Sequence, residues 1–147
     1  MLASIPDFKP IEFPPVPTQT VRAVKTDNER DFICFPPFNE KAMRLLAEFK
    51  NLKENWDGDG ALTPSQLAIR QAEHLIYRLQ KSGQKVFHTA PGPNGEIMVD
   101  VRNNGKSVEI IFYSDRAMFA KFPTLGMPTQ GEYRDEHLPK ILKWING

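Results

Sequence analysis

The chain contains very little cysteine and no long apolar run. Cys34 is the only cysteine among 147 residues, so no internal disulfide can form, which is typical of proteins from a reducing compartment. No segment has the roughly 18 consecutive apolar residues of a membrane span. Prolines interrupt the first twenty residues where a secretory signal needs a continuous apolar stretch. We therefore expect a cytoplasmic protein with no membrane partner.

An excess of charge of one sign is also absent. Lysine and arginine together number 19 and aspartate and glutamate 18, which gives a formal net charge of +1. Proteins that bind nucleic acid or anionic membranes usually present a concentrated basic surface. The lysines of the second half form no stripe interleaved with stacking aromatic residues, so nucleic acid is not an expected partner.

The common catalytic signatures are missing as well. The sequence has no G-x-S-x-G, no phosphate-binding loop, no H-E-x-x-H and no C-x-x-C. The three histidines, His74, His88 and His137, have neither metal-ligand spacing nor a nearby nucleophile. We expect His88 to lie on the core face of a strand. A non-catalytic protein is the leading interpretation.

Prolines are concentrated at the beginning of the chain. Seven of the 13 prolines fall within the first 37 residues. Each fixes its own φ and disfavours helix in the residue before it, so residues 1–37 are predicted to form an extended proline-rich arm. Phe8, Ile11 and Phe13 make this arm too apolar for a solvated tail. We expect it to pack against its own domain or a partner, and residues 38–147 to form one α+β domain.

Two helices are predicted at the start of that domain. Apolar residues at a 3.6 period favour a first helix with Asn39 as its N-cap. The second helix has Thr63 as N-cap and Pro64 at its first position, with Gln66 completing a capping box. Gly83 ends it. Because the link between them is short, the two helices are predicted to form a hairpin.

A four-stranded antiparallel meander and a C-terminal helix should follow. The predicted turns are Asn94-Gly95, Asn104-Gly105 and Ser114-Asp115. Asn-Gly is a strong hairpin signal because both residues tolerate positive φ. The second turn pairs Val101 with Val108, Val99 with Ile110, and Ile97 with Phe112. This gives one uniformly apolar face, which supports the register, and completes an α+β fold.

The opposite face of the predicted sheet has an apolar row of its own. The same registers place Met98, Ile111 and Met118 side by side, flanked by Tyr113. A solvated face rarely carries three large apolar residues in a row. Either the chain's own arm or last helix covers this row, or the row docks another protein or a second copy of the chain.

The loop between the two helices is the most distinctive segment. It reads Asn-Trp-Asp-Gly-Asp-Gly-Ala-Leu and places oxygen-bearing side chains at alternate positions, as calcium loops do. The candidate ligands are Asn55, Asp57, Asp59 and the carbonyl of Ala61. Gln66 stands where the bidentate glutamate of such a loop belongs, so calcium is the alternative to a structural turn allowed by Gly58 and Gly60. Trp56 is expected to be a buried anchor beside it.

The same loop carries a family resemblance. The run Asn55-Trp56-Asp57-Gly58-Asp59-Gly60-Ala61, with a leucine-rich helix before it and Pro64 and a helix after it, resembles the Asn-Trp-Asp-Gly-x-Gly-Ala core of an uncharacterised bacterial small-protein family. The likeness extends from residue 45 to residue 113, through the turn Asn94-Gly-Glu-Ile97. It implies a small companion protein from a phage or mobile-element neighbourhood. The arm is not part of the resemblance, and Asp59 occupies the family's variable position.

Acidic side chains offer one further alternative. The predicted register puts Asp100 opposite Glu109, with Arg102 next to Asp100 on the same face. Paired carboxylates can serve as an acid–base couple, but with the arginine they form a charge-balanced surface patch. An enzyme with an unrecognised carboxylate site therefore remains an alternative. Its candidate residues are Asp57, Asp59, Asp100 and Glu109.

These observations predict a non-catalytic protein-interaction module without a cofactor. Its partner is expected to be another protein or a second copy of itself, in a regulatory, inhibitory or antitoxin-like role. The expected interaction residues are Met98, Ile111, Tyr113 and Met118 on the sheet and Phe8, Ile11 and Phe13 on the arm.

Overall fold

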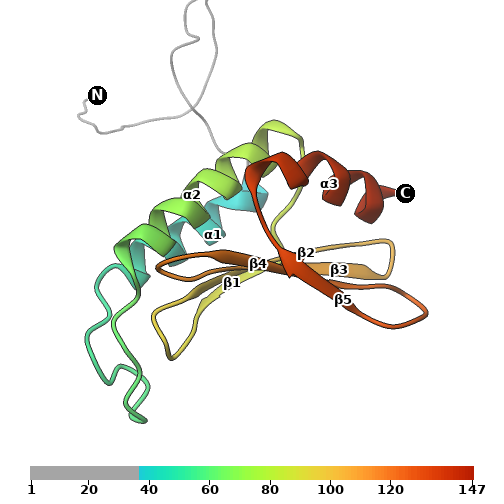
Figure 1. Cartoon of the computed structure of the whole chain (residues 1–147). Coiled ribbons are helices and arrows are strands. Elements are labelled where there is room, and N and C mark those ends of the chain that lie inside the picture. The colour runs from blue at the N-terminus through green and yellow to red at the C-terminus, as the bar shows by residue number, and fades with distance from the viewer. Residues whose placement is uncertain (1–36) are drawn as a thin grey trace, which may run out of the picture. The chain divides into compact units, whose positions relative to one another are not determined.

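A computed structural model describes residues 37–147 of the chain. They form three α-helices on one face of a five-stranded antiparallel sheet, which confirms the α+β class (Figure 1). The predictions for the arm, including Phe8, Ile11 and Phe13, lie outside the described residues. Pro37, which was assigned to the arm, begins the first helix.

The helices cover the sheet through apolar stripes. They are α1 (Pro37–Phe49), α2 (Gln66–Lys81) and α3 (Leu138–Asn146), and the one-turn 3-10 helix η2 (Asp135–His137) leads into α3. Leu46, Ile76 and Ile145, one from each α-helix, are fully buried against the sheet in one core. Burial of such a side chain contributes about 1.5–3 kcal/mol. No helix among residues 37–147 is long and apolar enough to cross a membrane.

The N-terminus of α2 lies later than predicted. Ser65 is the N-cap, and its Oγ accepts a hydrogen bond from Ala68 N at 3.2 Å. The predicted capping box of Thr63 and Gln66 is therefore wrong. The helix begins later because Ser65 N donates to Gly95 O at 2.9 Å, which holds the chain extended up to Ser65.

The first helix also begins before its predicted cap. Asn39 lies inside α1 and is fully buried. Its Oδ1 accepts from Val86 N at 3.0 Å, and its Nδ2 donates to Gln84 O at 3.3 Å. The side chain thus joins α1 to the segment between α2 and the sheet. Because both partners lie far away in the sequence, local pattern could not distinguish this role from an N-cap.

The sheet is a simple meander in chain order. Its strands are β1 (His88–Pro91), β2 (Ile97–Asn103), β3 (Lys106–Phe112), β4 (Ala117–Phe122) and β5 (Thr129–Glu132). The predicted pairs Val101–Val108, Val99–Ile110 and Ile97–Phe112 are confirmed. Asn104 and Gly105 have φ of 54° and 77°, as a tight hairpin turn requires.

The predicted count of four strands is wrong. The fifth strand, β5, pairs with β4, with Phe119 opposite Gly131. Its sequence, Thr-Gln-Gly-Glu, has little intrinsic preference for strand. It forms by pairing with the edge of β4. A local sequence pattern does not predict pairing of this kind.

The turn between β1 and β2 differs from the prediction by one residue. Pro91 pairs with Ile97, and residues 92–96 form the connection instead of a two-residue turn at Asn94-Gly95. A two-residue turn would need a hydrogen bond donated by the residue before Asn94. That residue is Pro93, which has no N–H.

The shifted register reverses the faces of β1. His88 is paired with Asp100 and is exposed on the side away from the helices, so its predicted core position is wrong. Thr89 takes the core position and satisfies its hydroxyl by donating to Met98 O at 2.7 Å. A slip of one residue exchanges every side chain between the two faces.

Replacing Asn39 with alanine should lower the free energy of unfolding by about 2 kcal/mol or more, because Val86 N–H and Gln84 C=O lose a buried partner. Urea unfolding of the full chain measures this. Asn51→Ala is the matched control, since Asn51 is exposed and its side chain makes no hydrogen bond within residues 37–147. Equal losses in the two variants would contradict the proposed role of Asn39.

Candidate functional site

The motif loop, residues 55–61, is closed on itself by hydrogen bonds. The Oδ1 atom of Asn55 accepts from Gly60 N at 2.7 Å. The Oδ1 atom of Asp57 accepts from Asp59 N at 2.8 Å and from Ala61 N at 3.1 Å. The backbone closes the same ring, because Asn55 N donates to Ala61 O at 2.7 Å. Both side chains therefore act as acceptors for the loop's own amides.

The other motif positions have conformational roles. Gly58 and Gly60 have φ of +81° and +85°, and Asn55 has φ of 64°, values that most residues avoid. Trp56 is half-buried, and its Nε1 donates to Leu62 O at 2.9 Å. Trp56 is thus less buried than the expected anchor. Its hydrogen bond joins the start of the loop to the residue that follows it.

These hydrogen bonds use atoms that a calcium ion would need. Asn55 and Asp57 each commit a side-chain oxygen to loop amides, and the carbonyl of Ala61 accepts from Asn55 N. Within residues 37–147 no group of three or more histidine, cysteine, aspartate or glutamate side chains could hold a metal ion. Calcium loops converge six or more oxygens on the ion. The geometry therefore favours the structural interpretation over calcium.

The motif loop is fastened to the β1–β2 connection. Leu62 N donates to Pro93 O at 2.8 Å, and Ser65 N donates to Gly95 O at 2.9 Å. The approach at Gly95 is close, because a Cβ there would lie 3.2 Å from Thr63 O. The two segments that carry the family resemblance thus form one joined corner of the fold.

The face of the sheet away from the helices, here called the outer face, carries the predicted apolar row. Met98 pairs with Ile111, and Ile111 pairs with Met118. All three are half-buried, and none belongs to the core beneath the helices. At the end of the row Tyr113 is half-buried, with the Arg116 guanidinium 4.4 Å from its ring centre.

A polar row lies beside the apolar one on the same face. It runs across β1, β2 and β3 through His88, Asp100 and Glu109. Asp100 is only 3% exposed. Its Oδ2 accepts a hydrogen bond from Arg102 Nε at 3.1 Å and forms an ion pair with Arg102 Nη2 at 3.0 Å. The guanidinium of Arg102 also lies 3.8 Å over the ring of Phe87.

A cleft of about 570 Å³ lies between α2 and the ends of β3, β4 and β5. Its floor includes Phe112 and Tyr133, whose rings meet edge to face at 6.0 Å. Its polar lining includes Arg70, His74, Ser114, Arg116, Glu132 and Asp135.

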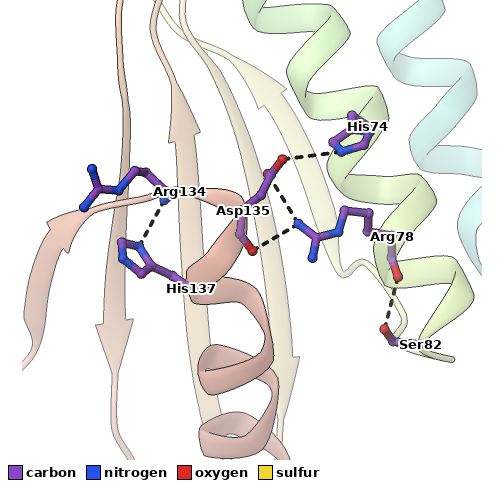
Figure 2. Close-up of polar contacts among 6 residues, drawn as sticks. All are labelled: His74, Arg78, Ser82, Arg134, Asp135 and His137. Atoms are coloured by element: carbon purple, nitrogen blue, oxygen red, sulfur yellow. Dashed lines mark hydrogen bonds and ion pairs between the residues drawn. The ribbon is translucent and has the colours of Figure 1, made fainter.

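Beside the cleft a polar network fastens η2 to α2. The Asp135 carboxylate lies 3.5 Å from His74 Nε2 and 3.4 Å from Arg78 Nη1, and Arg78 Nη1 also donates to Asp135 O at 3.1 Å (Figure 2). The side chains of His74 and Asp135 are 57% and 61% exposed, so solvent screens their attraction. Arg134 N donates to His137 Nδ1 at 3.0 Å and fixes the first turn of η2 (Figure 2).

Sequence reasoning missed that Ser114, His74 and Asp135 line one cleft, because they come from three separate elements. The described residues contain no hydrogen bond from Ser114 to His74, and Asp135 is already paired with Arg78. A working nucleophile needs a base within hydrogen-bond reach. Burial, together with the nearby Asp135 carboxylate, raises the pKa of Tyr133 to about 12, so this phenol stays protonated.

The four carboxylates of the enzyme alternative are divided between two places. Asp57 and Asp59 lie in the motif loop, whereas Asp100 and Glu109 lie in the middle of β2 and β3. Asp57 has a structural task as acceptor for two amides, and Asp100 is paired with Arg102. This arrangement does not favour a shared acid–base site.

The loop predicts a pH dependence. The N–H of Asp59 and, to a smaller extent, that of Ala61 hold the pKa of the Asp57 carboxyl below its ordinary 3.8. A depressed pKa stabilises the fold above the unfolded value, and this contribution is lost as the pH falls through the folded-state pKa. Asp57→Asn should therefore be less stable than the wild type at pH 7, and the difference should shrink as the pH falls below 3.8.

Chemical unfolding across this pH range measures the effect, with Asp59→Asn as the control. The side chain of Asp59 accepts no hydrogen bond in the described structure, so that variant should match the wild type throughout. A pH-independent difference for Asp57→Asn would show that its carboxylate charge is irrelevant to the loop.

Comparison with known proteins identifies no relative of this chain. No protein-family model, curated protein or solved structure matches the chain. The resemblance of the motif loop to a bacterial small-protein family therefore stays a prediction. The functional conclusion depends on the geometry of residues 37–147.

Proposed function

We propose that this chain is a non-catalytic protein-interaction module whose outer sheet face binds another protein or a second copy of itself. The biological role would be that of a regulatory, inhibitory or antitoxin-like companion protein. The phage or mobile-element setting of that role follows only from the motif resemblance.

The observation that carries the proposal is the one-sidedness of the domain. All three helices of the described chain lie on the same face of the sheet (Figure 1). Their apolar stripes pack in the core with Val99, Ile110 and the other sheet residues that face the helices. No helix or strand of residues 37–147 covers the outer row of Met98, Ile111 and Met118. Burial of three such side chains by a partner would contribute roughly 5–8 kcal/mol before ordering costs.

The residue types around the row are those that protein interfaces favour. Methionine is flexible and adapts to irregular partner surfaces. Tyrosine and arginine are enriched at interfaces, and here Tyr113 and Arg116 stack at the end of the row. Tyr113 and Arg116 lie in the connection between β3 and β4, where Tyr113 N donates to Arg116 O at 2.8 Å, so their ordering on binding should cost little.

The test is co-purification with the full chain from its native cells, comparing Met98→Glu and Met118→Glu with the wild type. A charge in the middle of the row should remove a stoichiometric partner, or dissociate a dimer, without changing the melting temperature much. The control is Met127→Glu, since Met127 is 82% exposed in the loop between β4 and β5. That variant should retain the partner.

Two results would overturn the proposal. One is a partner that survives both face substitutions. The other is a wild-type chain that is monomeric and binds nothing. Deletion of residues 1–17 tests a third occupant, because a gain in hydrophobic-dye binding in that variant alone would assign the row to the chain's own N-terminal segment.

A further inference from the structure

The outer face also indicates what chemistry the partner brings. We infer that the partner inserts a basic side chain, a lysine or an arginine, between Asp100 and Glu109, with apolar side chains beside it on the Met98 row. This inference rests on the proposed function and adds the partner's chemistry to it.

The first observation is an unpaired oxygen on a buried carboxylate. The Oδ1 atom of Asp100 has no hydrogen-bond partner in the described chain, although its side chain is 96% buried. Native proteins rarely leave such an atom unsatisfied, because a lost hydrogen bond at a charged group costs more than at a neutral one. A cationic partner group would remove this cost.

The chain's own arginine does not fill that position. The Nε and Nη2 atoms of Arg102 both point at the other oxygen, Oδ2, at 3.1 Å and 3.0 Å. The Phe87 ring fixes the guanidinium from its face at 3.8 Å. Moving Arg102 to Oδ1 would break both the forked pair and the stacking contact. Oδ1 is therefore left without a donor from residues 37–147, and a partner's cation must displace the side chains that shield it from solvent.

The second observation is a second carboxylate directly across the sheet. Glu109 pairs with Asp100 in the register and is half-buried, and it makes no ion pair within residues 37–147. Cβ atoms of directly paired residues lie about 5 Å apart, and like charges at that distance repel. One ammonium or guanidinium group placed between the two carboxylates would satisfy Oδ1 and remove the repulsion.

The neighbouring row suits the stem of such a side chain. Met98 and Ile111 lie two residues from Asp100 and Glu109 on the same strands, which is about 7 Å along the sheet. Lysine and arginine pack their aliphatic stems on apolar surface while the charged end reaches a polar group. A divalent metal ion fits less well, because His88, although it neighbours Asp100, forms with the two carboxylates no group of three side chains that could hold a metal ion.

The experiment uses the full chain, with ¹³C-labelled methionine methyl groups and ¹⁵N-labelled amides, and three small probes. They are n-hexylammonium, n-hexanol and n-hexanoate, which share an apolar tail and differ in charge. Hexylammonium should shift the Met98 and Met118 methyl signals and the Glu109 amide at a concentration about fivefold lower than hexanol. Hexanoate should be the weakest probe.

Matched variants assign the effect to the two carboxylates. Glu109→Gln and Asp100→Asn should each abolish the preference for hexylammonium over hexanol. Glu109→Gln is the safer of the two, because the Glu109 side chain makes no hydrogen bond or ion pair within residues 37–147 and is less buried than Asp100. Glu132→Gln, which changes an exposed acid opposite Met118 on the same face, should retain the preference.

Several outcomes would overturn the inference. Equal responses to the three probes, or a preference unchanged in Glu109→Gln, would exclude a cation site at this pair. The same shifts produced by millimolar calcium chloride would assign the pair to a metal. A response seen only after removal of residues 1–17 would assign the site to the chain's own N-terminal segment.

The two proposals fail separately. A partner lost in Met98→Glu together with three equal probe responses would uphold the interaction module and reject the basic side chain. A clear ammonium preference without any partner or dimer would reject the interaction module itself.

Discussion

The pairing of β2 with β3 is the constraint on which the rest of this structure depends. A two-residue turn at Asn104-Gly105 sets the register, and the register sets which side chains face the helices. Val99 and Ile110 then enter the core, while Met98 and Ile111 are left on the other side. The core, the apolar row and the carboxylate pair are therefore three consequences of one alignment. A shift in the β2–β3 register would alter the outer face, and it would also move Val99 and Ile110 out of the core.

Sequence pattern succeeded where the deciding interaction was local and failed where it was distant. The β2–β3 register was predictable because Asn-Gly determines its own turn. The β1 register was missed for a reason that the sequence did contain, the missing N–H of Pro93. Asn39 was misjudged because its partners, Val86 and Gln84, lie in another part of the chain. The strand β5 could not be recognised because its pairing depends on β4 rather than on its own residues.

The motif loop shows the same limit at the level of chemistry. Oxygen-bearing side chains at alternate positions were predicted as ligands or caps, and of these Asn55 and Asp57 accept hydrogen bonds whereas Asp59 accepts none within the described residues. The spacing alone does not indicate what such side chains bind. In the structure they bind the loop's own amides at Asp59, Gly60 and Ala61. The outer row was predicted in full, with Met98, Ile111 and Met118 in the right order. Its unpaired carboxylate oxygen was not, because burial of Asp100 depends on side-chain placement.

The joined corner between the motif loop and the β1–β2 connection has an evolutionary consequence. Gly95 admits no side chain without pressing on Thr63 O, and Leu62 and Ser65 bond to the backbone of the same connection. A substitution in one segment must therefore be compatible with the backbone geometry of the other, although some thirty positions separate them. In any lineage that keeps the Asn-Trp-Asp-Gly loop, the glycine at the strand connection should be inherited with it. We therefore expect the two segments to vary together, because each sets the backbone geometry that the other must accept.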